Sequence, residues 1–535
     1  MPAERVIIHS TMHIVIADAL PDSAAEPFRE RGWTVDAHSG RTADALARDL
    51  RDADALIVRS ATQVTASLLD AAPRLRVIAR AGTGVDNVDL DAASQRGILV
   101  LNAAGANSIS VAELALGLMI ALARGIPAAD TSMKNGAWDK KRFTGIELRG
   151  KLLGVIGFGR IGREVSARAR AFGMEVIAHD PFIGSRAAED VAVPLVSLDD
   201  LLHRSDFISL HVPSLPETHH LIDAARLSKC RRGVRIVNTA RGELVDEAAL
   251  ADAIEQGIVA GAALDVFEQE PPTDRRLACL PQVVATPHIA ASTREAQELV
   301  GVEVAVAVRD YLSDGTVRNA VNFPAIPVEE MSAVRPFLLA AEKLGRFVAQ
   351  LAPEHPQAIG IRYYGEVVTR HESLVGSSVL AGALSPFVDG TVTQVNARKL
   401  AADRGIDIVE SRSTRSRDFV NVISVKLHGG NGERWAEATV LHPNRARLCS
   451  LDGIDIEMPL AGTLIVIRND DRPGVIGSVG TVLGRHGINI GSFGLGRSND
   501  SAIGVLAVDP APRLEAAVEE LRKVPNVKDV RLVTL

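Results

Sequence analysis

Three residues suited to oxidoreductase chemistry follow apolar runs in the middle of the chain. Arg241 follows RIVNTA, Glu270 ends ALDVFEQE, and His288 follows VVATP. An arginine grips a carboxylate through paired hydrogen bonds, and a histidine exchanges a proton near neutral pH. A carboxylate beside that histidine raises the imidazole pKa, which favours the protonated acid needed to reduce a ketone. The set suits hydride exchange on a small 2-hydroxy acid, although each residue taken singly also has an ordinary structural explanation.

A glycine-rich loop predicts a dinucleotide site. GFGRIG has the spacing G-x-G-x-x-G, follows the apolar run LLGVIG and opens a helical sequence. The first glycine permits a tight turn, the second lets a pyrophosphate approach the backbone, and the third allows close packing of the helix. Asp180, which ends EVIAHD, can bind the adenosine ribose hydroxyls, and this favours NAD over NADP. The predicted cofactor residues of this half are Gly157, Gly159, Arg160, Ile161, Gly162 and Asp180.

The elements that position these residues form two α/β series. Apolar runs alternate with helical stretches over residues 12–107, including a helix at 24–31, and again over residues 152–289. The alternation indicates a parallel α/β sheet in each series, and the continuous apolar runs of the second series indicate a sheet covered on both faces. Helices are expected at 110–123 and 292–312. We expect a flavodoxin-like substrate domain at 12–108 and 293–327, split by a nested Rossmann domain at 109–292.

Four motifs in order resemble the D-isomer-specific 2-hydroxyacid dehydrogenases. They are GFGRIG with Asp180, LLHRSDFISLHVPSLPETHHLI, RIVNTARGELVDEAAL, and LDVFEQEP followed by TPHIAAST. The resemblance implies that Arg241 orients the substrate, that His288 is the acid and base, and that Glu270 is its partner. It also implies a nicotinamide site made by Thr239, Ala240, Arg241, Asp265, His288, Ile289, Ala290 and Ala291.

The N-terminal residues are similar to those of family members that oxidise 3-phospho-D-glycerate to 3-phosphohydroxypyruvate at the entry to L-serine synthesis. A phosphate at the far end of the substrate requires arginines opposite the catalytic set. Arg59 and Arg80 are the candidates, and the substrate-binding prediction comprises Arg59, Arg80, Asn102, Asn107 and Arg241. Members that act on simpler hydroxy acids share much of this region.

The C-terminal residues 461–535 have the order β-α-β-β-α-β, which is the ferredoxin-like arrangement. The sequence IRNDDRPGVIGSVGTVLGRHGINIGSFGLGR resembles the ACT domain, a module that binds amino acids. By that resemblance Asp471 faces the ammonium group of L-serine, and Asn489 bonds it across an interface between chains. A module that only dimerises remains the alternative. Residues 328–455 carry no chemical motif and resemble an intervening α+β domain of the long members of the family.

Composition limits the remaining choices. The 535 residues carry a net charge of −7, so the chain has no overall basic field for nucleic acid. The three cysteines lie far apart, and no window is apolar for about 18 residues, so no metal site, disulfide or membrane partner is expected. We expect a cytoplasmic homotetramer. Residues 1–11 precede the first strand pattern and receive no function.

Two other functions remain open from the sequence. The nearer is another D-2-hydroxyacid dehydrogenase, acting on lactate, glyoxylate or 2-oxoglutarate. The more distant is an NAD-sensing binding protein without catalysis, which could retain the same three residues. Turnover of a phosphorylated substrate separates the first alternative, and turnover of any kind excludes the second.

Overall fold

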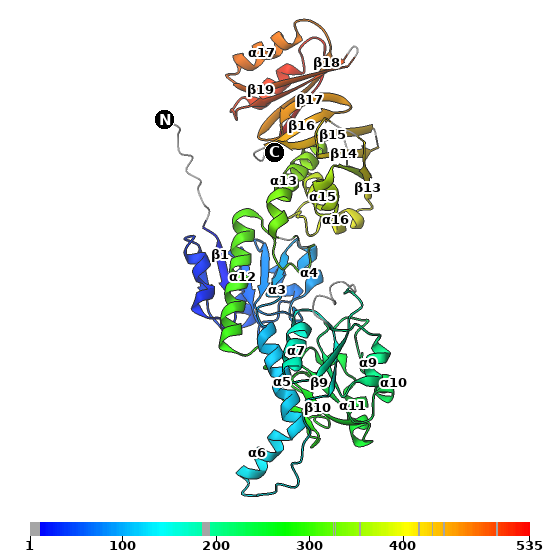
Figure 1. Cartoon of the computed structure of the whole chain (residues 1–535). Coiled ribbons are helices and arrows are strands. Elements are labelled where there is room, and N and C mark those ends of the chain that lie inside the picture. Colours follow the sequence, from blue (N-terminus) through cyan, green and yellow to red (C-terminus); the bar gives the residue numbers. More distant parts are fainter. Residues whose placement is uncertain are drawn as a thin grey trace.

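The computed structural model describes residues 11–535 except 184–192, 325, 327, 353–354, 416–417, 431, 442–444 and 499–500. Four sheets occur in these residues, and in Figure 1 the units that contain them lie one beyond another from the C-terminal domain to the central lobe. The predicted fold class is confirmed, with two parallel α/β lobes followed by an α+β domain and a ferredoxin-like domain. The N-terminal residues 1–10 lie outside the described residues.

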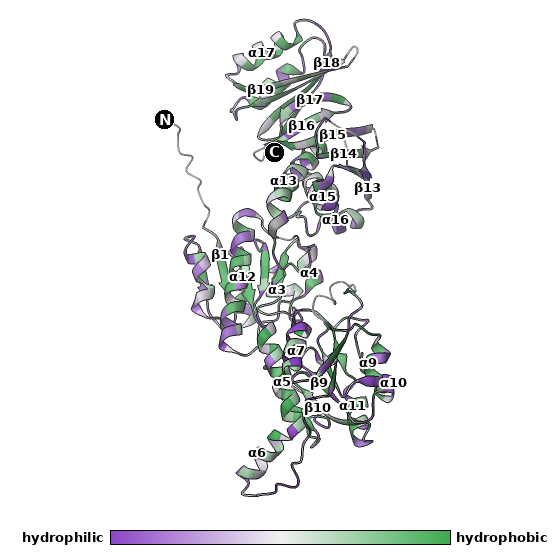
Figure 2. Cartoon of the chain, viewed as in Figure 1, coloured by the Kyte–Doolittle hydropathy of each residue, from purple (hydrophilic) through white to green (hydrophobic). Residues whose placement is uncertain are grey.

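The N-terminal lobe contains a five-stranded parallel sheet in the order β2-β1-β3-β4-β5, which is the order of flavodoxin. Its apolar strands have helices on both faces, and Figure 2 shows these strands in the hydrophobic colour. The helix expected at 24–31 is shorter, because Pro27 opens it in the second position. The elements are β1 (His13–Ile16), α1 (Glu26–Arg29), β2 (Thr34–Ala37), α2 (Ala43–Asp49), β3 (Ala55–Val58), α3 (Ala66–Asp70), β4 (Val77–Arg80), α4 (Leu90–Gln95) and β5 (Leu99–Asn102).

The central lobe contains a six-stranded parallel sheet in the order β7-β6-β8-β9-β10-β11. Leu210, Asn238 and Leu264 are paired across the ends of β8, β9 and β10, so the loops that follow these strands share one edge. That carboxyl edge is where open α/β sheets bind ligands. The elements are β6 (Leu152–Ile156), α7 (Arg160–Ala171), β7 (Glu175–His179), α9 (Leu198–Arg204), β8 (Phe207–Leu210), α10 (Ala224–Lys229), β9 (Val234–Asn238), α11 (Glu247–Glu255), β10 (Val259–Leu264) and β11 (Val283–Ala285).

Two helices carry the chain between the lobes. The first is α5 (Ser108–Arg124), and the second is α12 (Arg294–Asp314), which packs on the sheet of the N-terminal lobe. α12 begins where Thr293 caps it, since Oγ1 of Thr293 accepts a hydrogen bond from the backbone N–H of Ala296. Oγ of Ser110 lies 2.7 Å from Oγ1 of Thr293, so the two connections are hydrogen-bonded to each other.

Beyond α5 the chain forms an arm that projects from the central lobe (Figure 1). Gly125 adopts a φ of +60°, and α6 (Ile126–Lys134) starts after it at an angle of 64° to α5. Ile126, Met133 and Trp138 of this arm are exposed. Within the described part of the chain no single helix could cross a membrane, and only the bent pair α5 and α6 taken together has the length and composition to do so.

The intervening domain has a six-stranded sheet in the order β13-β12-β14-β15-β16-β17, with helices packed in its core. It contacts the N-terminal lobe after α4, where Oγ1 of Thr393 donates to the carbonyl of Gly97 at 3.0 Å. The elements are α13 (Val328–Leu351), β12 (Ala358–Tyr364), α14 (Glu366–Arg370), α15 (Glu372–Leu384), α16 (Ala397–Asp403), β13 (Asp407–Ser413), β14 (Val422–Gly429), β15 (Gly432–Leu441), β16 (Arg445–Leu451) and β17 (Ile454–Pro459).

The C-terminal domain has the predicted order of strands and helices. Its antiparallel sheet runs β19-β20-β18-β21, and the sheet face opposite its two helices packs on the core of the intervening domain through Val466 and Val505. The two domains therefore share one hydrophobic core. The elements are β18 (Thr463–Asp470), α17 (Val475–Arg485), β19 (Ile490–Ser498), β20 (Ser501–Val508), α18 (Leu514–Leu521) and β21 (Val527–Thr534).

Candidate active site

The three glycines of the GFGRIG loop differ in their surroundings. Gly157 has a φ of +92°, and an ideal Cβ there would lie 2.5 Å from the carbonyl oxygen of His211. An ideal Cβ on Gly162 would lie 2.1 Å from the carbonyl oxygen of Gly157, whereas one on Gly159 would meet nothing within 4 Å. There is thus no room for a side chain at Gly157 in the turn or at Gly162 in the helix, whereas the space beside Gly159 is open. These are the three conditions for bringing a pyrophosphate to the backbone.

The surroundings of the loop also fit NAD. Gly159 is the N-cap of α7 and makes no side-chain cap, so the N–H groups of the first helical turn are available to an anion. Asp180 follows β7 directly and accepts hydrogen bonds from the N–H groups of Phe158 and Phe182, both at 2.9 Å. Oγ1 of Thr239 is buried and has no hydrogen-bond partner among the described residues. A ligand at the carboxyl edge of the sheet could complete the bonding of that hydroxyl.

His288 and Glu270 form a hydrogen-bonded pair. Nδ1 of His288 lies 2.6 Å from Oε2 of Glu270. This hydrogen bond is the main cause that raises the pKa of His288, ahead of the opposing effect of burial. Burial is the largest single influence on Glu270 and raises its pKa, but the hydrogen bond and charge of His288, the backbone N–H of Phe267 and the charge of Arg241 together outweigh it, so the net pKa of Glu270 is lowered. His288 also has a φ of +51°, a strained conformation for a residue with a side chain.

Asp265 fixes the loop that carries His288. Its carboxylate is fully buried and accepts hydrogen bonds from the N–H of Ile289 at 2.9 Å and the N–H of Ala290 at 2.8 Å. The hydroxyl of Thr286 donates to the same carboxylate at 2.6 Å. The loop therefore wraps around a single acid at the end of β10. Of the residues expected to line the nicotinamide, Asp265 is the one whose oxygens are already bonded to the backbone of the others.

Arg241 reaches from the central lobe to the N-terminal lobe. Its Nη1 donates to the carbonyl of Ala240 at 2.6 Å, and its Nη2 lies 3.1 Å from Oδ2 of Asp86. The guanidinium lies against Gly84, because an ideal Cβ at that glycine would be 1.8 Å from Nη2 of Arg241. The positive charge of Arg241 also acts to lower the pKa of both His288 and Glu270. The three residues predicted to carry the chemistry therefore occupy one region where the lobes meet.

Arg80 and Arg59 bring further positive charge to that region. Burial, followed by the charges of Arg241 and Arg59, lowers the pKa of Arg80. Nε of Arg80 donates to Oδ1 of Asn87 at 3.3 Å, and its guanidinium lies against Gly82. The carbonyl of Arg59 accepts a hydrogen bond from the side-chain amide of Asn87 at 2.6 Å, which ties β3 to the loop after β4. The sequence predicted both arginines, and the structure brings them together.

Asn102 and Asn107 bond to the protein itself. Nδ2 of Asn102 donates to the carbonyl of Thr83 at 2.5 Å, and the hydroxyl of Thr83 donates to Oδ1 of Asn107 at 2.8 Å. Both asparagines therefore hold the loop that lies against Arg241. Their predicted contact with substrate stays a prediction, and the bonds to Thr83 use one polar atom of each side chain.

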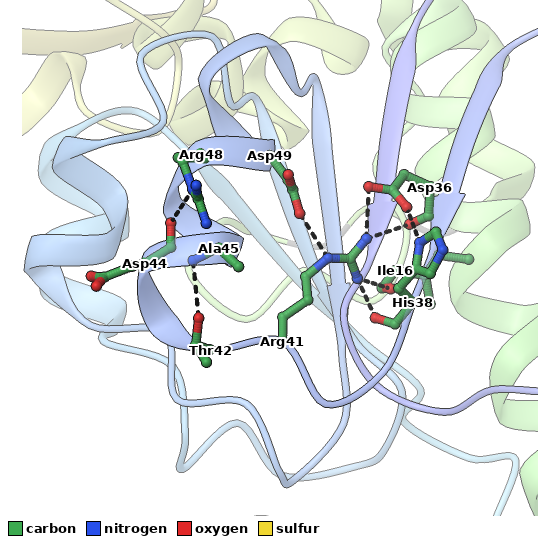
Figure 3. Close-up of polar contacts among 9 residues, drawn as sticks. All are labelled: Ile16, Asp36, His38, Arg41, Thr42, Asp44, Ala45, Arg48 and Asp49. Carbon is green, nitrogen blue, oxygen red and sulfur yellow. Dashed lines mark hydrogen bonds and ion pairs between the residues drawn. The ribbon is translucent and has the colours of Figure 1, made fainter.

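Another arginine of the N-terminal lobe, Arg41, has a purely structural environment (Figure 3). Its guanidinium forms ion pairs with Asp36 at 2.7 Å and with Asp49 at 2.8 Å, and it donates to the carbonyl of Ile16 at 3.0 Å. The Arg41 side chain is 7% exposed. All of its bonding capacity serves to join β1, β2 and α2, which distinguishes it from Arg59 and Arg80.

The two predicted effector residues lie apart in the C-terminal domain, each with a partner. Oδ2 of Asp471 pairs with Nη2 of Arg497 at 2.6 Å, while Nδ2 of Asn489 donates to Oδ2 of Asp509 at 3.1 Å. Gly474, at the N-cap of α17, has a φ of +93° and no side-chain cap. The N-cap of α17 therefore makes no side-chain hydrogen bond to the first turn of the helix.

Sequence reasoning missed Asp86 and His211. Asp86 lies in the sequence GTGVDNVD of the N-terminal lobe, but only the meeting of the lobes reveals its pairing with Arg241. Nδ1 of His211 is buried and has no partner among the described residues, and burial lowers the pKa of His211 to about 4. Its place directly after β8, next to the end of β9, is the signal that could have indicated it.

Three family models match successive parts of the chain. They are the NAD binding domain of D-isomer specific 2-hydroxyacid dehydrogenases at residues 116–290, the intervening domain of D-3-phosphoglycerate dehydrogenase at 333–452, and the ACT domain at 463–526. Together with the glycine loop and the residues at the lobe junction, they define an NAD-dependent D-isomer-specific 2-hydroxyacid dehydrogenase with two additional domains.

Relatives that match over nearly the whole chain show which family of these dehydrogenases the chain belongs to. D-3-phosphoglycerate dehydrogenase of Methanocaldococcus jannaschii is 41% identical over 98% of this chain and 99% of its own length. That of Mycobacterium tuberculosis is 43% identical over 89% and 90%. The chain belongs to the D-3-phosphoglycerate dehydrogenase family.

Solved structures resemble the two lobes. TT0316 from Thermus thermophilus is 37% identical with a TM-score of 0.54, covering 58% of this chain and all of its own. D-lactate dehydrogenase from Aquifex aeolicus, solved with NAD and lactic acid, is 30% identical with a TM-score of 0.52 over the same shares. The likeness thus covers the dehydrogenase part of the chain.

Proposed function

We propose that this enzyme uses NAD to oxidise 3-phospho-D-glycerate to 3-phosphohydroxypyruvate, the first step of L-serine biosynthesis. The observation that carries the proposal is the meeting of Arg241 with the Arg80 region of the opposite lobe, beside the pair of His288 and Glu270. Arg241 binds the substrate carboxylate, and Arg59 and Arg80 bind its phosphate. A substrate with an anion at each end matches cations supplied by both lobes.

The proton step belongs to His288. Because Nδ1 bonds Glu270, Nε2 is the nitrogen left to face the substrate hydroxyl. In the oxidative direction neutral His288 accepts the hydroxyl proton as the C2–H bond breaks. The glycine loop, Asp180, Thr239 and the backbone at 289–291 would hold NAD, which would supply the acceptor for the hydride. Glu270 stabilises the resulting imidazolium, and Asp265 keeps the His288 loop in position.

L-Serine is the proposed effector of the C-terminal domain. Asp471 bears the charge needed for an ammonium group, and the uncapped turn before α17 offers backbone N–H groups to a carboxylate. Asn489 lies on the loop before β19 and completes the site from a second chain. The bond between Asp471 and Arg497 must open for this binding.

Assembly into a cytoplasmic homotetramer is also part of the proposal. The arm around α6 exposes Ile126, Met133 and Trp138, and exposed apolar groups of this size favour burial in an interface. Cys230, Cys279 and Cys449 are all free thiols, as in a reducing compartment. We propose the domain limits 12–108 with 293–327, 109–292, 328–455 and 461–535.

The test is the initial rate of NADH formation from 3-phospho-D-glycerate, with and without millimolar L-serine, with D-lactate and D-2-hydroxyglutarate as controls. Preferred turnover of the phosphorylated substrate supports the catalytic proposal, and suppression by serine supports the effector. If the enzyme prefers D-lactate or D-2-hydroxyglutarate, its substrate is another hydroxy acid and not 3-phospho-D-glycerate. Absence of turnover despite NADH binding favours an NAD sensor. Light scattering on the same sample measures the number of subunits.

A further inference from the structure

An acidic side chain holds the arginine to which the substrate carboxylate is assigned. Oδ2 of Asp86, in the N-terminal lobe, lies 3.1 Å from Nη2 of Arg241, in the central lobe. The two side chains are 65% and 25% exposed, so solvent and small ligands reach the pair. Asp86 thus bridges the lobes through the guanidinium that the proposed reaction requires.

The backbone brings these two groups together. Gly84 lies under both, since an ideal Cβ on it would be 1.8 Å from Nη2 of Arg241 and 2.6 Å from Oδ2 of Asp86. Asn102 fixes this loop through the carbonyl of Thr83. A side chain at residue 84 would collide with both groups, so the glycine allows the guanidinium of Arg241 and the carboxylate of Asp86 to meet.

The other acids of the region are committed elsewhere. Asp18 is buried and accepts hydrogen bonds from the hydroxyl of Thr62 at 2.7 Å and from the backbone N–H of Arg59. Glu270 is bonded to His288. Asp86 is consequently the acid that pairs with the guanidinium of Arg241 among the described residues, and its charge also opposes the lowering of the Arg80 pKa.

We propose that Asp86 is an internal competitor of the substrate carboxylate. It neutralises Arg241 across the lobe junction in the free enzyme, and the carboxylate of the incoming substrate displaces it. This inference rests on the proposed function for the role of Arg241. By occupying the guanidinium, Asp86 lowers the affinity for substrate and for product, whose carboxylate is the same, and so speeds product release.

The size of the effect follows from the exposure of the pair. Partly exposed ion pairs contribute little, and their rupture changes a binding constant by about two- to fivefold. Removing the charge of Asp86 while keeping its shape should therefore tighten the binding of carboxylate ligands by about that factor. A ligand that carries the phosphate without the carboxylate should be affected much less.

The experiment compares Asp86→Asn with the wild type and with Asp91→Asn, an exposed acid on α4 of the same lobe. Calorimetry on the full-length enzyme saturated with NADH measures binding of 3-phospho-D-glycerate and of glycerol 3-phosphate, which lacks the carboxylate. We expect tighter binding of the first ligand alone in Asp86→Asn and no change in Asp91→Asn. If both ligands bind Asp86→Asn more tightly by the same factor, Asp86 acts through its general electrostatic field. If 3-phospho-D-glycerate binds more weakly, Asp86 serves to position Arg241. Either result overturns the proposal.

A second variant pair makes the test specific to Arg241. In an Arg241→Gln background the competitor has nothing to occupy, so adding Asp86→Asn should leave the affinity for 3-phospho-D-glycerate unchanged. A tightening that persists in this background refutes the competition. Turnover of 3-phospho-D-glycerate by the wild type is recorded separately. Its absence overturns the proposed function, whereas normal turnover with unaltered affinity in Asp86→Asn overturns only the role of Asp86.

Discussion

Nδ1 of His288 lies 2.6 Å from Oε2 of Glu270, and this bond raises the pKa of the histidine more than burial lowers it. The proton on the imidazole is therefore retained to higher pH than in an isolated histidine. The same bond selects which nitrogen can meet the substrate. The pH dependence of turnover in both directions follows from this one contact.

Glu270→Gln should move the pH profile to lower values. The amide removes the charge that favours the imidazolium, so the pKa of His288 falls. Oxidation needs the neutral imidazole, and its kcat/KM should rise with pH through the His288 pKa, at lower pH in the variant than in the wild type. Reduction needs the imidazolium and loses activity with rising pH, also earlier in the variant. NADH absorbance between pH 5.5 and 10 measures both limbs.

The control for this profile is Glu268→Gln. Glu268 lies two residues from Glu270 and bonds His220 at 2.8 Å instead of His288. Removing the charge of Glu268 should leave the pH dependence of both oxidation and reduction as in the wild type. Profiles that coincide in wild type and Glu270→Gln would contradict the assigned pair.

His288→Ala should lower kcat by about 10²-fold or more, the usual effect of losing a general acid and base. The glycine loop and Asp180, which are predicted to hold the pyrophosphate and the adenosine ribose, are not altered, so NADH should still bind, and any loss of affinity should be small beside the loss of kcat. Stopped-flow measurement of a single turnover, together with NADH fluorescence titration, separates chemistry from binding. A variant with the wild-type rate of hydride transfer removes His288 from the mechanism.

Much of this architecture could be predicted from local sequence. The alternation of apolar runs with helical stretches predicted the two parallel sheets, because helices cover both faces of each sheet, and the spacing in GFGRIG predicted one open and two closed glycines. The sheet prediction depends on the burial of the strands, and the loop prediction depends on interactions between residues close in the chain. Arg241, Glu270 and His288 were identified as single candidates at the ends of runs, and the shared carboxyl edge of β9 to β11 explains their meeting.

Contacts between lobes could not be predicted in the same way. Asp86 meets Arg241 only because the chain crosses between the lobes through α5 and α12, and no local pattern encodes that distance. Asn102 and Asn107 remain predicted substrate ligands, and the structure adds that each also bonds Thr83 in the loop that lies against Arg241. Sequence indicates that an amide is present, whereas the packed loop decides which of its atoms bond the protein.

Arg80→Gln should separate substrates by their distal anion. A hydrogen bond to a charged group is worth about 1.5–3 kcal/mol, so kcat/KM for 3-phospho-D-glycerate should fall about 10- to 100-fold. D-Lactate carries no second anion and should change far less. The control is Arg74→Gln, an exposed arginine of the same lobe that pairs with Asp54. An equal loss on both substrates would assign Arg80 to the fold of the loop and not to the phosphate.

The final prediction concerns His211, whose pKa burial lowers from an ordinary 6.5 to about 4. The unfolded chain therefore binds a proton below about pH 6.5, while the folded protein does not bind it until about pH 4. The contribution of neutral His211 to the free energy of unfolding is fully present above pH 6.5. It is lost between pH 6.5 and 4 as the pH drops, by up to about 3 kcal/mol. Nε2 of His211 lies 2.8 Å from Oγ of Ser209, a contact that glutamine can replace without titrating.

His211→Gln should consequently lose less stability than the wild type between pH 6.5 and 4. Denaturant unfolding followed by tryptophan fluorescence at several pH values gives the two curves, and their difference isolates one histidine from the many acids that titrate in the same range. His203→Gln, at an exposed histidine of α9, should follow the wild-type curve. Parallel curves for wild type and His211→Gln would mean that burial does not lower the pKa of His211 in the folded enzyme.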